Sequence, residues 1–337
     1  MSGYNPKVSV VIPFFNAERT LSQAIESIAQ QDFSDFECIL VDNNSTDAGA
    51  VIAGEWQRRD PRFRLVSEQK QGVMYASNRG CELAGGTYIA RMDADDVAYP
   101  HRLRMQAGFL DENREYGAVA GLVKHVGDPE TTGGFRRFVE WSNSVVTYKE
   151  IFHRRFIEAP IVNPTAMWRR ETMERYGLYR SGNFPEDYEM WLRWLDQGVK
   201  IAKIPEVVLE WHDSTQRLTR TDPIYSDGAF YQIKSEYLAR WLTANNPFHP
   251  DVWVWGASRI SRRRARVLEQ YGVRIKTYID TKEGRQLDRE VLYYEEVPDA
   301  GELFILTYIR QMDNRDRIRE FLESRGYKEG ENYMLVS

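Results

Sequence analysis

Three features of the sequence predict an α/β protein whose main sheet is parallel. Short apolar runs alternate with segments of helical spacing over residues 8–92. Polar clusters follow three of the expected strands, so we expect them to gather at one edge of the sheet. A second alternation of strand and helix signals after residue 247 predicts a smaller, Rossmann-like α/β domain.

The first part of the chain contains four strand-like runs joined by helix-like segments. The runs are rich in β-branched and apolar residues and occupy residues 8–12, 38–41, 63–66 and 88–92. The expected helices follow Asn16, extend from 46 toward 60, and cover 72–84. Parallel strands need such crossover helices, so this alternation favours a parallel sheet.

The periodicity weakens after residue 100. The weaker signals are a mixed stretch at 117–126, a loop around Gly133 and Gly134, a polar segment at 213–222, a helix at 230–242 and a linker at 244–247. The C-terminal strands are expected at 252–255, 273–279, 303–307 and 333–336. An arginine-rich helix after Gly256 and a helix near 315–323 complete this second pattern.

Composition and charge narrow the functional classes. The 337 residues are 42% hydrophobic and 28% charged, as in a globular protein, and a net charge of -5 argues against a nucleic acid partner. Cys38 and Cys81 lie in apolar stretches, which predicts buried thiols in a reducing compartment. Residues 1–7 lack a signal-peptide core, and no run approaches the roughly 18 apolar residues of a membrane span. We therefore expect a cytoplasmic protein, with peripheral contact at the inner face of the membrane left open.

Three carboxylates follow the strand expected at 88–92. Asp93, Asp95 and Asp96 would repel one another unless a cation offset their charge. Mg2+ or Mn2+ suits such a site, because these ions take few protein carboxylates and share their other positions with water and phosphates. The alternative is an acidic turn or helix cap.

Four segments in order resemble the family 2 glycosyltransferases, which have the GT-A fold. They read VSVVIPFFN at 8–16, VDNNSTD at 41–47, GVMYASN at 72–78 and MDADD at 92–96. The resemblance continues through NPTAM at 163–167 and FPEDYEMWLR at 184–193, so it covers about two thirds of the chain. It implies a GT-A domain at 1–246 and leaves 247–337 as a Rossmann-like accessory domain. Within the first domain, a nucleotide-sugar half would occupy about 1–100, an acceptor half about 101–220 and a helical linker about 228–246.

The resemblance also implies roles for individual residues. Pro13, Asn16 and Asp42 would line the nucleotide base pocket, with Glu18 at the same rim, Asp93 facing the ribose and Asp95 ligating the metal. His212 matches a histidine that some relatives use as a further metal ligand, although a satisfied polar histidine is the alternative. Lys70 and Arg217 lie near the matched loops and are candidates for phosphate contacts. Asn43 departs from the family, which commonly has a second aspartate there.

Asp187 matches the general base of the family. An acceptor hydroxyl is a poor nucleophile near neutral pH, so a carboxylate must take its proton during attack on the anomeric carbon. The metal would stabilise the departing nucleotide diphosphate, and one base with one metal suffices for inversion. By position alone, Glu186 and Asp187 would simply be acidic residues in a first helical turn. Trp191 and Trp194 share a helix face, where core packing competes with stacking on a sugar.

The resulting hypothesis is an inverting glycosyltransferase of bacterial polysaccharide or glycoconjugate synthesis. Its donor would be a nucleotide diphosphate sugar, with UDP favoured by frequency in the family, and its acceptor a saccharide or lipid-linked saccharide. The competing hypothesis is a non-catalytic nucleotide-sugar-binding or assembly subunit. A nucleotidyltransferase lacks support, because no glycine-rich triphosphate loop follows the first strand.

The C-terminal domain carries no complete cofactor motif. Gly256 is followed by Ala257 and Ser258, so two glycines of a dinucleotide-binding turn are missing and NAD is not expected. Its arginine-rich helix is interpreted as a solvated face, with a protein partner or anionic lipid as alternatives. These arginines are Arg259, Arg262, Arg263, Arg264 and Arg266.

Overall fold

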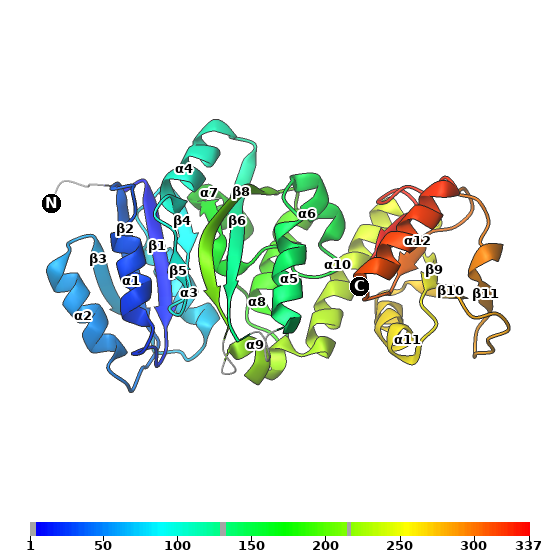
Figure 1. The fold of residues 1–337 in the computed structure, drawn as a ribbon, viewed down its shortest axis with the longest axis horizontal. Helices are drawn as coiled ribbons and strands as arrows, with labels where there is room; N and C mark the ends of the chain where they lie inside the picture. The colour runs from blue at the N-terminus through cyan, green and yellow to red at the C-terminus, as the bar shows by residue number, and fades with distance from the viewer. Residues whose placement is uncertain (1–4, 129–132, 214–216) are drawn as a thin grey trace. The chain divides into compact units, whose positions relative to one another are not determined.

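The chain forms two compact units. The computed structural model describes residues 5–128, 133–213 and 217–337. The N-terminal unit comprises Met1–Ile151, Pro160–Gly182 and Glu186–Thr221, and the C-terminal unit comprises Phe152–Ala159, Asn183–Pro185 and Asp222–Ser337 (Figure 1). The chain therefore passes between the units several times.

The expected parallel half of the main sheet is confirmed. Strands β1 (Val8–Phe14), β2 (Phe36–Asp42), β3 (Phe63–Ser67) and β4 (Tyr88–Arg91) pair in parallel in the order β3-β2-β1-β4. The intervening helices are α1 (Leu21–Ala29), α2 (Gly49–Arg59) and α3 (Val73–Leu83). All seven residues of β1 are buried, which explains its continuous apolar sequence.

The sheet continues beyond β4 with mixed pairing. Strand β7 (Met167–Arg169) is antiparallel to both β4 and β6 (Tyr116–Val126), β6 is parallel to β8 (Lys200–His212), and β5 (Val97–Ala98) is antiparallel to β8. The mixed stretch at 117–126 is thus one long strand. Its periodicity is weak because the pairing with β8 shifts register at several points.

The prediction of a loop around Gly133 and Gly134 was wrong in part. Both glycines belong to α5 (Gly133–Asn143), and residues 129–132 lie outside the described range. Tertiary packing overrides glycine's low helix propensity here. Phe135 and Phe138 of α5 pack against Trp211 of β8, with ring centroids 5.5 and 6.1 Å apart.

Six further helical segments lie within residues 99–221 of the described chain. They are α4 (Arg102–Glu112), α6 (Tyr148–Arg154), η1 (Asn163–Thr165), α7 (Arg170–Tyr176), α8 (Glu186–Asp196) and α9 (Leu218–Thr221). Trp191 and Trp194 of α8 are buried, pack edge-to-face 5.4 Å apart, and contact Trp168 of β7. They therefore belong to the core, and neither is placed to stack on a sugar.

Both cysteines are buried free thiols, as expected. Cys38 lies in β2 and Cys81 in α3. Burial raises the pKa of Cys38 well above its usual value and that of Cys81 to about 12. A thiol that stays protonated in an apolar site is a poor nucleophile, so neither cysteine is a candidate for chemistry.

Helix α3 approaches the sheet closely at Gly80. A Cβ atom at this position would lie 2.3 Å from Cγ1 of Val11 and 3.0 Å from Cγ2 of Val41. We expect Gly80→Ala to destabilise the protein by about 1–3 kcal/mol, because β1 and β2 would have to shift. The control is Gly108→Ala in α4, where no atom lies within 4 Å of such a Cβ. That change should stabilise by about 0.4–1 kcal/mol. Thermal unfolding measures both, and equal melting temperatures would contradict the packing described.

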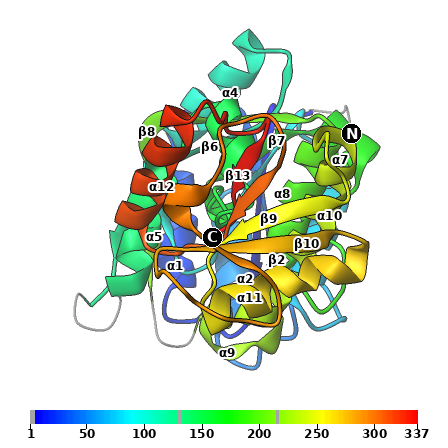
Figure 2. The same ribbon diagram turned by 90° about the vertical axis from the view of Figure 1, so that its right-hand side faces the viewer.

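The C-terminal unit is a five-stranded parallel sheet, which confirms the Rossmann-like expectation. Its order is β11-β10-β9-β12-β13 (Figure 2). The strands are β9 (Asp251–Trp255), β10 (Arg274–Asp280), β11 (Val291–Tyr293), β12 (Ile305–Thr307) and β13 (Tyr333–Leu335). The helical segments are η2 (Pro223–Tyr225), α10 (Asp227–Asn245), α11 (Arg259–Ala265), η3 (Arg266–Tyr271), η4 (Tyr294–Glu296) and α12 (Met312–Ser324). Strand β11 was not expected from the sequence.

Helix α10 packs within the C-terminal unit. The buried Lys234 ammonium donates to the carbonyls of Ile157, at 2.9 Å, and Val336, at 3.1 Å. The Tyr231 hydroxyl shares a 2.6 Å hydrogen bond with Ser337. The helix expected at about 228–246 is therefore present and is packed within this unit, while the domain boundary at 246 remains a prediction.

The arginines of α11 and η3 mostly pair inside the C-terminal unit. Arg264 binds Asp227 at 2.5 Å, and both Arg262 and Arg266 pair with Asp288. Among these residues, Arg263 is the most exposed of those with an acidic partner. Most of this helix is thus engaged in salt bridges, which weakens the idea of a lipid-binding face.

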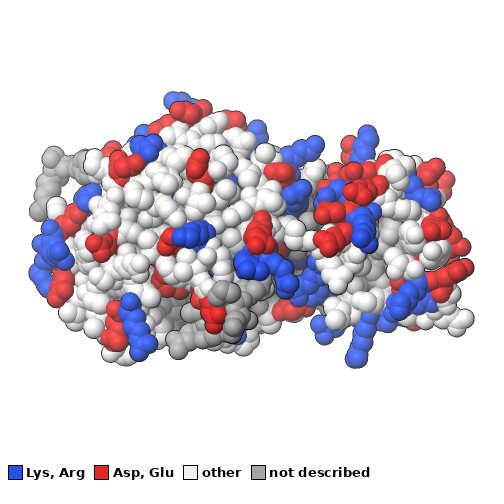
Figure 3. Space-filling view, in the orientation of Figure 1, with Lys and Arg blue, Asp and Glu red and all other residues white. Residues whose placement is uncertain are grey.

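Charged side chains and helix composition can both be followed on the described residues. Acidic and basic side chains are interspersed on the face shown in Figure 3, without one continuous basic surface. No helix in the described ranges combines the length and the apolar composition needed to cross a bilayer.

Candidate active site

The candidate site lies at the carboxyl ends of the parallel strands in the N-terminal unit. β1 leads to Asn16, β2 ends at Asp42, and β4 leads directly to Asp93. The pairing registers of β1 with β2 and β4 bring these three ends to one edge of the sheet. The convergence of polar loops expected from the sequence is therefore present in the structure.

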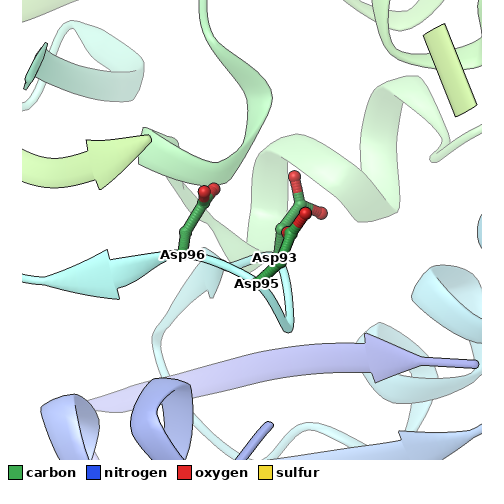
Figure 4. A group of neighbouring side chains, drawn as sticks. All are labelled: Asp93, Asp95 and Asp96. Carbon is green, nitrogen blue, oxygen red and sulfur yellow. The ribbon is translucent and has the colours of Figure 1, made fainter. Parts of the chain in front are cut away.

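Three aspartates cluster on the connection between β4 and β5. One carboxylate oxygen each from Asp93, Asp95 and Asp96 lies within 4.8 Å of the others. Figure 4 shows the three side chains projecting from the same side of this connection. Asp96 is fully buried, and its Oδ2 atom has no hydrogen-bond partner among the described residues.

The three aspartates of this cluster differ in whether an arginine pairs with them. Arg91 is buried and binds Asp93 at 2.8 Å, and Arg217 approaches the other oxygen of Asp93 at 3.7 Å. Neither Asp95 nor Asp96 has an ion pair within the described part of the chain. Burial and the nearby Asp93 charge raise the pKa of Asp95, and they raise that of Asp96 well above its usual value.

A hard divalent cation fits this donor set. The cluster supplies only carboxylate oxygens, the ligands that Mg2+ and Mn2+ prefer. The unpaired Asp96 oxygen and the raised carboxyl pKa values indicate that Arg91 and Arg217 offset only part of the negative charge of the three carboxylates. A bound cation would lower these pKa values and offset the remaining negative charge.

His212 contacts the aspartate cluster through its backbone. Its N–H donates to Asp96 Oδ1 at 2.9 Å, and its carbonyl accepts from Arg217 at 2.8 Å. The group of three carboxylates does not extend to its ring. The ring Nδ1 atom is buried and has no partner in the described ranges. His212 is thus beside the cluster, while metal ligation by its ring remains a prediction.

Arg217 is held next to the cluster by two further contacts. Its guanidinium lies over the Trp211 ring, 4.2 Å from the centroid, in addition to its bond with the His212 carbonyl. Residues 214–216 of the polar segment expected at 213–222 lie outside the described range, and α9 occupies the end of that segment. Arg217 is therefore a cation held beside Asp93.

Asp187 lies in the first turn of α8 and is half-buried. Its pKa is raised to about 6, mainly by burial and also by the Asp93 charge, while a hydrogen bond from the Tyr188 N–H and the Arg91 charge oppose the increase. These electrostatic interactions connect Asp187 with the Arg91 and Asp93 pair. A carboxylate whose pKa is near 6 is ionised at neutral pH and is a better proton acceptor than an ordinary aspartate.

Glu189, which is also in the first turn of α8, has different surroundings. Glu189 is buried and binds Arg193 at 2.9 Å and Arg180 at 3.6 Å. Arg193 in turn donates to backbone carbonyls at Tyr176, Gly177 and Leu178. Glu189 therefore fixes α8 to the segment before it, a role that no local sequence pattern indicates.

Asn16 and Asp42 lie where the first two loops meet. Asn16 has a positive φ of 49°, its Oδ1 accepts from the Thr46 N–H at 2.8 Å, and its own N–H donates to the Ser45 hydroxyl at 3.1 Å. Asp42 Oδ1 accepts from the Ser45 N–H at 3.1 Å. These bonds join the loop after β1 to the loop after β2.

Glu18 and Asp47 make a second connection between the same loops. Glu18 Oε2 accepts from the Ala48 N–H at 3.1 Å, and Asp47 Oδ2 accepts from the Glu18 N–H at 2.8 Å. Asp47 also accepts from the Gly49 N–H, which explains why α2 begins later than the expected residue 46. Pro13 is buried within β1, paired with Val41. Glu18, in contrast, is exposed.

Lys70 belongs to a third loop, which connects β3 to α3. Its ammonium lies over the Tyr75 ring, 3.9 Å from the centroid. The backbone of this loop is bound by Asn43, the residue that departs from the family pattern. Lys70 itself is exposed, so a phosphate role for it remains a prediction.

Comparisons with known proteins agree with this geometry. The family described as Glycosyl transferase family 2 matches residues 9–177. Putative glycosyltransferase EpsE of Bacillus subtilis (strain 168) is 31% identical over 226 residues, which cover 66% of this chain and 78% of EpsE. Amylovoran biosynthesis glycosyltransferase AmsE of Erwinia amylovora is 25% identical over 232 residues, covering 67% and 85% of the two chains.

A solved structure shows the same fold. S. aureus TarS 1-349, crystallised in complex with UDP-GlcNAc, superposes with a TM-score of 0.56 at 18% sequence identity. The match covers 79% of this chain and 71% of TarS 1-349.

Proposed function

The chain belongs to glycosyl transferase family 2 and is a glycosyltransferase of the GT-A fold, and on this premise we propose that it is an inverting, metal-dependent enzyme. It would move a sugar from a nucleotide diphosphate to a hydroxyl acceptor. The observation that carries this proposal is the electrostatic link between Asp187, with its pKa near 6, and Asp93 of the aspartate cluster. A proton acceptor and a candidate cation site thus lie close together in the N-terminal unit.

The donor would be held by the aspartate cluster and the rim above it. We assign Asp95 to the metal, with His212 as a second ligand, and Asp93 to the ribose. Mg2+ or Mn2+, when bound, would offset the negative charge of the departing nucleotide diphosphate. Arg217, already fixed at Asp93, would add a positive charge on the phosphate side, and Lys70 would supply another from the third loop.

Asp187 would act as the general base. It takes the proton from the acceptor hydroxyl as the oxygen attacks the anomeric carbon and the bond to the phosphate breaks. A single displacement of this kind inverts the anomeric configuration. A non-catalytic binding subunit would have no use for a half-buried carboxylate whose pKa is raised in this way.

We propose a UDP-sugar as donor and a saccharide or lipid-linked saccharide as acceptor, in the synthesis of a polysaccharide or glycoconjugate. The base would lie against Pro13, Asn16, Glu18 and Asp42, where one Asp42 oxygen is already bonded to Ser45. The UDP-GlcNAc complex of TarS and the amylovoran role of AmsE support this choice. Peripheral contact with the inner face of a membrane would bring the enzyme to a lipid-linked acceptor.

A donor panel tests the proposal. UDP-, GDP- and dTDP-sugars are incubated with the full chain, with saccharide and lipid-linked acceptors, in Mn2+, in Mg2+ or in a chelator. We expect release of one nucleotide diphosphate that depends on both acceptor and metal. Equal release in the chelator would contradict the metal role, and binding of a donor without any release would favour the non-catalytic subunit.

A further inference from the structure

Asn43 joins the ends of three strands beside the candidate site, through its side chain and its backbone N–H. Its Nδ2 atom donates to the carbonyls of Glu68, at 2.9 Å, and Lys70, at 2.8 Å, and its Oδ1 atom accepts from the Gly72 N–H at 2.8 Å. Its backbone N–H donates to the Phe14 carbonyl at the end of β1, at 2.9 Å. Asn43 itself follows β2, so the ends of β1, β2 and β3 are all joined at this residue.

The chemistry of these contacts requires an amide. Asparagine offers two donor hydrogens and one acceptor oxygen in a plane, and all three are used here. An ionised aspartate has no donor, so it would place a negative oxygen against the Glu68 and Lys70 carbonyls. Asn43 is only 3% exposed, so water has little access to replace lost bonds. The departure from the family pattern at this position therefore has a specific structural consequence.

The segment held by Asn43 borders the proposed base pocket. It comprises residues 68–72, defined here as the 68–72 loop, and carries Lys70. The loop begins next to Asp42, since the Glu68 N–H donates to the Asp42 carbonyl at 2.9 Å. It ends at Gly72, whose φ of 137° favours glycine and which precedes α3. Both ends of the loop are therefore fixed relative to Asp42, the residue assigned to the nucleotide base.

We propose that Asn43 is a positioning residue for the donor nucleotide, which holds the 68–72 loop against Asp42 so that the pocket is preformed. This inference rests on the proposed function. Fixing a pocket before binding lowers the entropic cost of binding, so the effect should appear in donor affinity. Chemistry at Asp187 and at the aspartate cluster should be affected little, because Asn43 contacts neither group through the hydrogen bonds described.

The neighbouring residue provides a matched control. Asn44 also uses its amide on the 68–72 loop, donating to the Gln69 carbonyl at 2.8 Å and to the Gln71 side chain at 3.2 Å. Unlike Asn43, Asn44 is half-buried at the surface, where water can replace these bonds. Making the same substitution at both positions therefore distinguishes the effect of buried hydrogen bonds to the 68–72 loop from the effect of exposed ones.

The test combines amide exchange with steady-state kinetics of Asn43→Ala, Asn43→Asp and Asn44→Asp in the full chain. Asn43→Ala should speed hydrogen exchange in the peptide covering 68–72 without changing exchange in α8. Both Asn43 variants should raise the donor KM by about tenfold or more, with kcat and the acceptor KM within about threefold of wild type. Asn44→Asp should match wild type in every measurement, since aspartate also tolerates the positive φ of 64° at this position.

Two results would overturn the assignment. One is unchanged exchange in the 68–72 peptide of Asn43→Ala, which needs no donor and therefore tests the connection even if the proposed function fails. The other is an unchanged donor KM, or an equal loss in kcat and both KM values, in a wild-type enzyme that does transfer sugar. Absence of transfer by the wild type would instead count against the proposed function. If Asn43→Asp does not fold, amide exchange and steady-state kinetics are both measured on Asn43→Ala.

Discussion

Replacing Asp187 with asparagine should lower kcat by roughly 100-fold to 10,000-fold while donor binding persists. The amide keeps the size and shape of the side chain and can still accept the bond from the Tyr188 N–H, but it cannot take a proton from the acceptor. Steady-state rates at saturating donor and acceptor, together with calorimetric nucleotide binding, measure the two effects separately. The control is Asp196→Asn at the exposed end of α8, which should match wild type.

The pH dependence gives an independent check on Asp187. Its pKa is raised from 3.8 to about 6, so the wild-type rate should fall as the pH drops through about 6 and the carboxylate becomes protonated. The Asp187→Asn variant has no such group, so its rate should not show this fall at low pH. A wild-type rate that stays constant from pH 8 to pH 5 would contradict the general-base role, as would a loss confined to the acceptor KM.

Stability should change in the opposite direction from activity. Because the pKa of Asp187 is higher in the folded state than in the unfolded chain, ionising this group weakens the fold as the pH rises from about 4 through about 6. Asp187→Asn removes that penalty. We expect the variant to melt at the same temperature as wild type or higher at pH 8, with the difference vanishing below pH 4. A lower melting temperature at pH 8 would indicate that the loss of activity is structural.

Replacing Asp95 with asparagine should abolish turnover and remove the metal dependence of nucleotide binding. The substitution takes one negative charge from a cluster whose three carboxylates lie within 4.8 Å of one another, and a neutral amide oxygen is a weaker ligand for Mg2+ or Mn2+. Calorimetry with UDP, with and without Mn2+, measures the effect. The proper comparison is wild type in a chelator, which the variant should resemble.

The stability of the Asp95→Asn variant should be preserved or improved in the absence of metal. Burial and the Asp93 charge raise the pKa of Asp95, so its ionised form is unfavourable in the folded protein at neutral pH. Adding Mn2+ should raise the melting temperature of wild type more than that of the variant. Undiminished stimulation of UDP binding by Mn2+ in the variant would rule out Asp95 as the ligand.

The sequence predicts some strands well and others poorly, for physical reasons. The apolar run of β1 is visible because both faces of the strand are covered. Strands β5, β7 and β11 have two or three residues each, too few for a periodic signal, and their conformation depends on the neighbours with which they pair. In β8, the exposed Pro205 and Glu206 interrupt the apolar pattern near a shift in the pairing with β6.

The candidate site was predictable where short motifs follow strands. Asp42, Asp93 and Asp95 lie at the expected sheet edge, and Asp187 lies in the first helical turn that was the alternative explanation for the acidic pair at 186–187. The supporting contacts could not be predicted, because their partners are backbone groups far away in the sequence. Asn43 binds carbonyls 25 and 27 residues away, and Glu18 accepts from an N–H 30 residues away. No local pattern records such a pairing.

The interleaved segments of the C-terminal unit have a consequence for biosynthesis. Lys234 joins the carbonyl of Ile157 to that of Val336, so residues 152–159 reach their final neighbours only when the last residues of the chain are available. During translation, the main sheet is complete once β8 has left the ribosome, at residue 212. Residues 152–159 must then wait, with part of their final packing missing, until more than a hundred further residues have been added. The nascent chain therefore holds an unfinished surface in the middle of its sequence until Val336 has been added, and that interval is when a chaperone would be of most use to it.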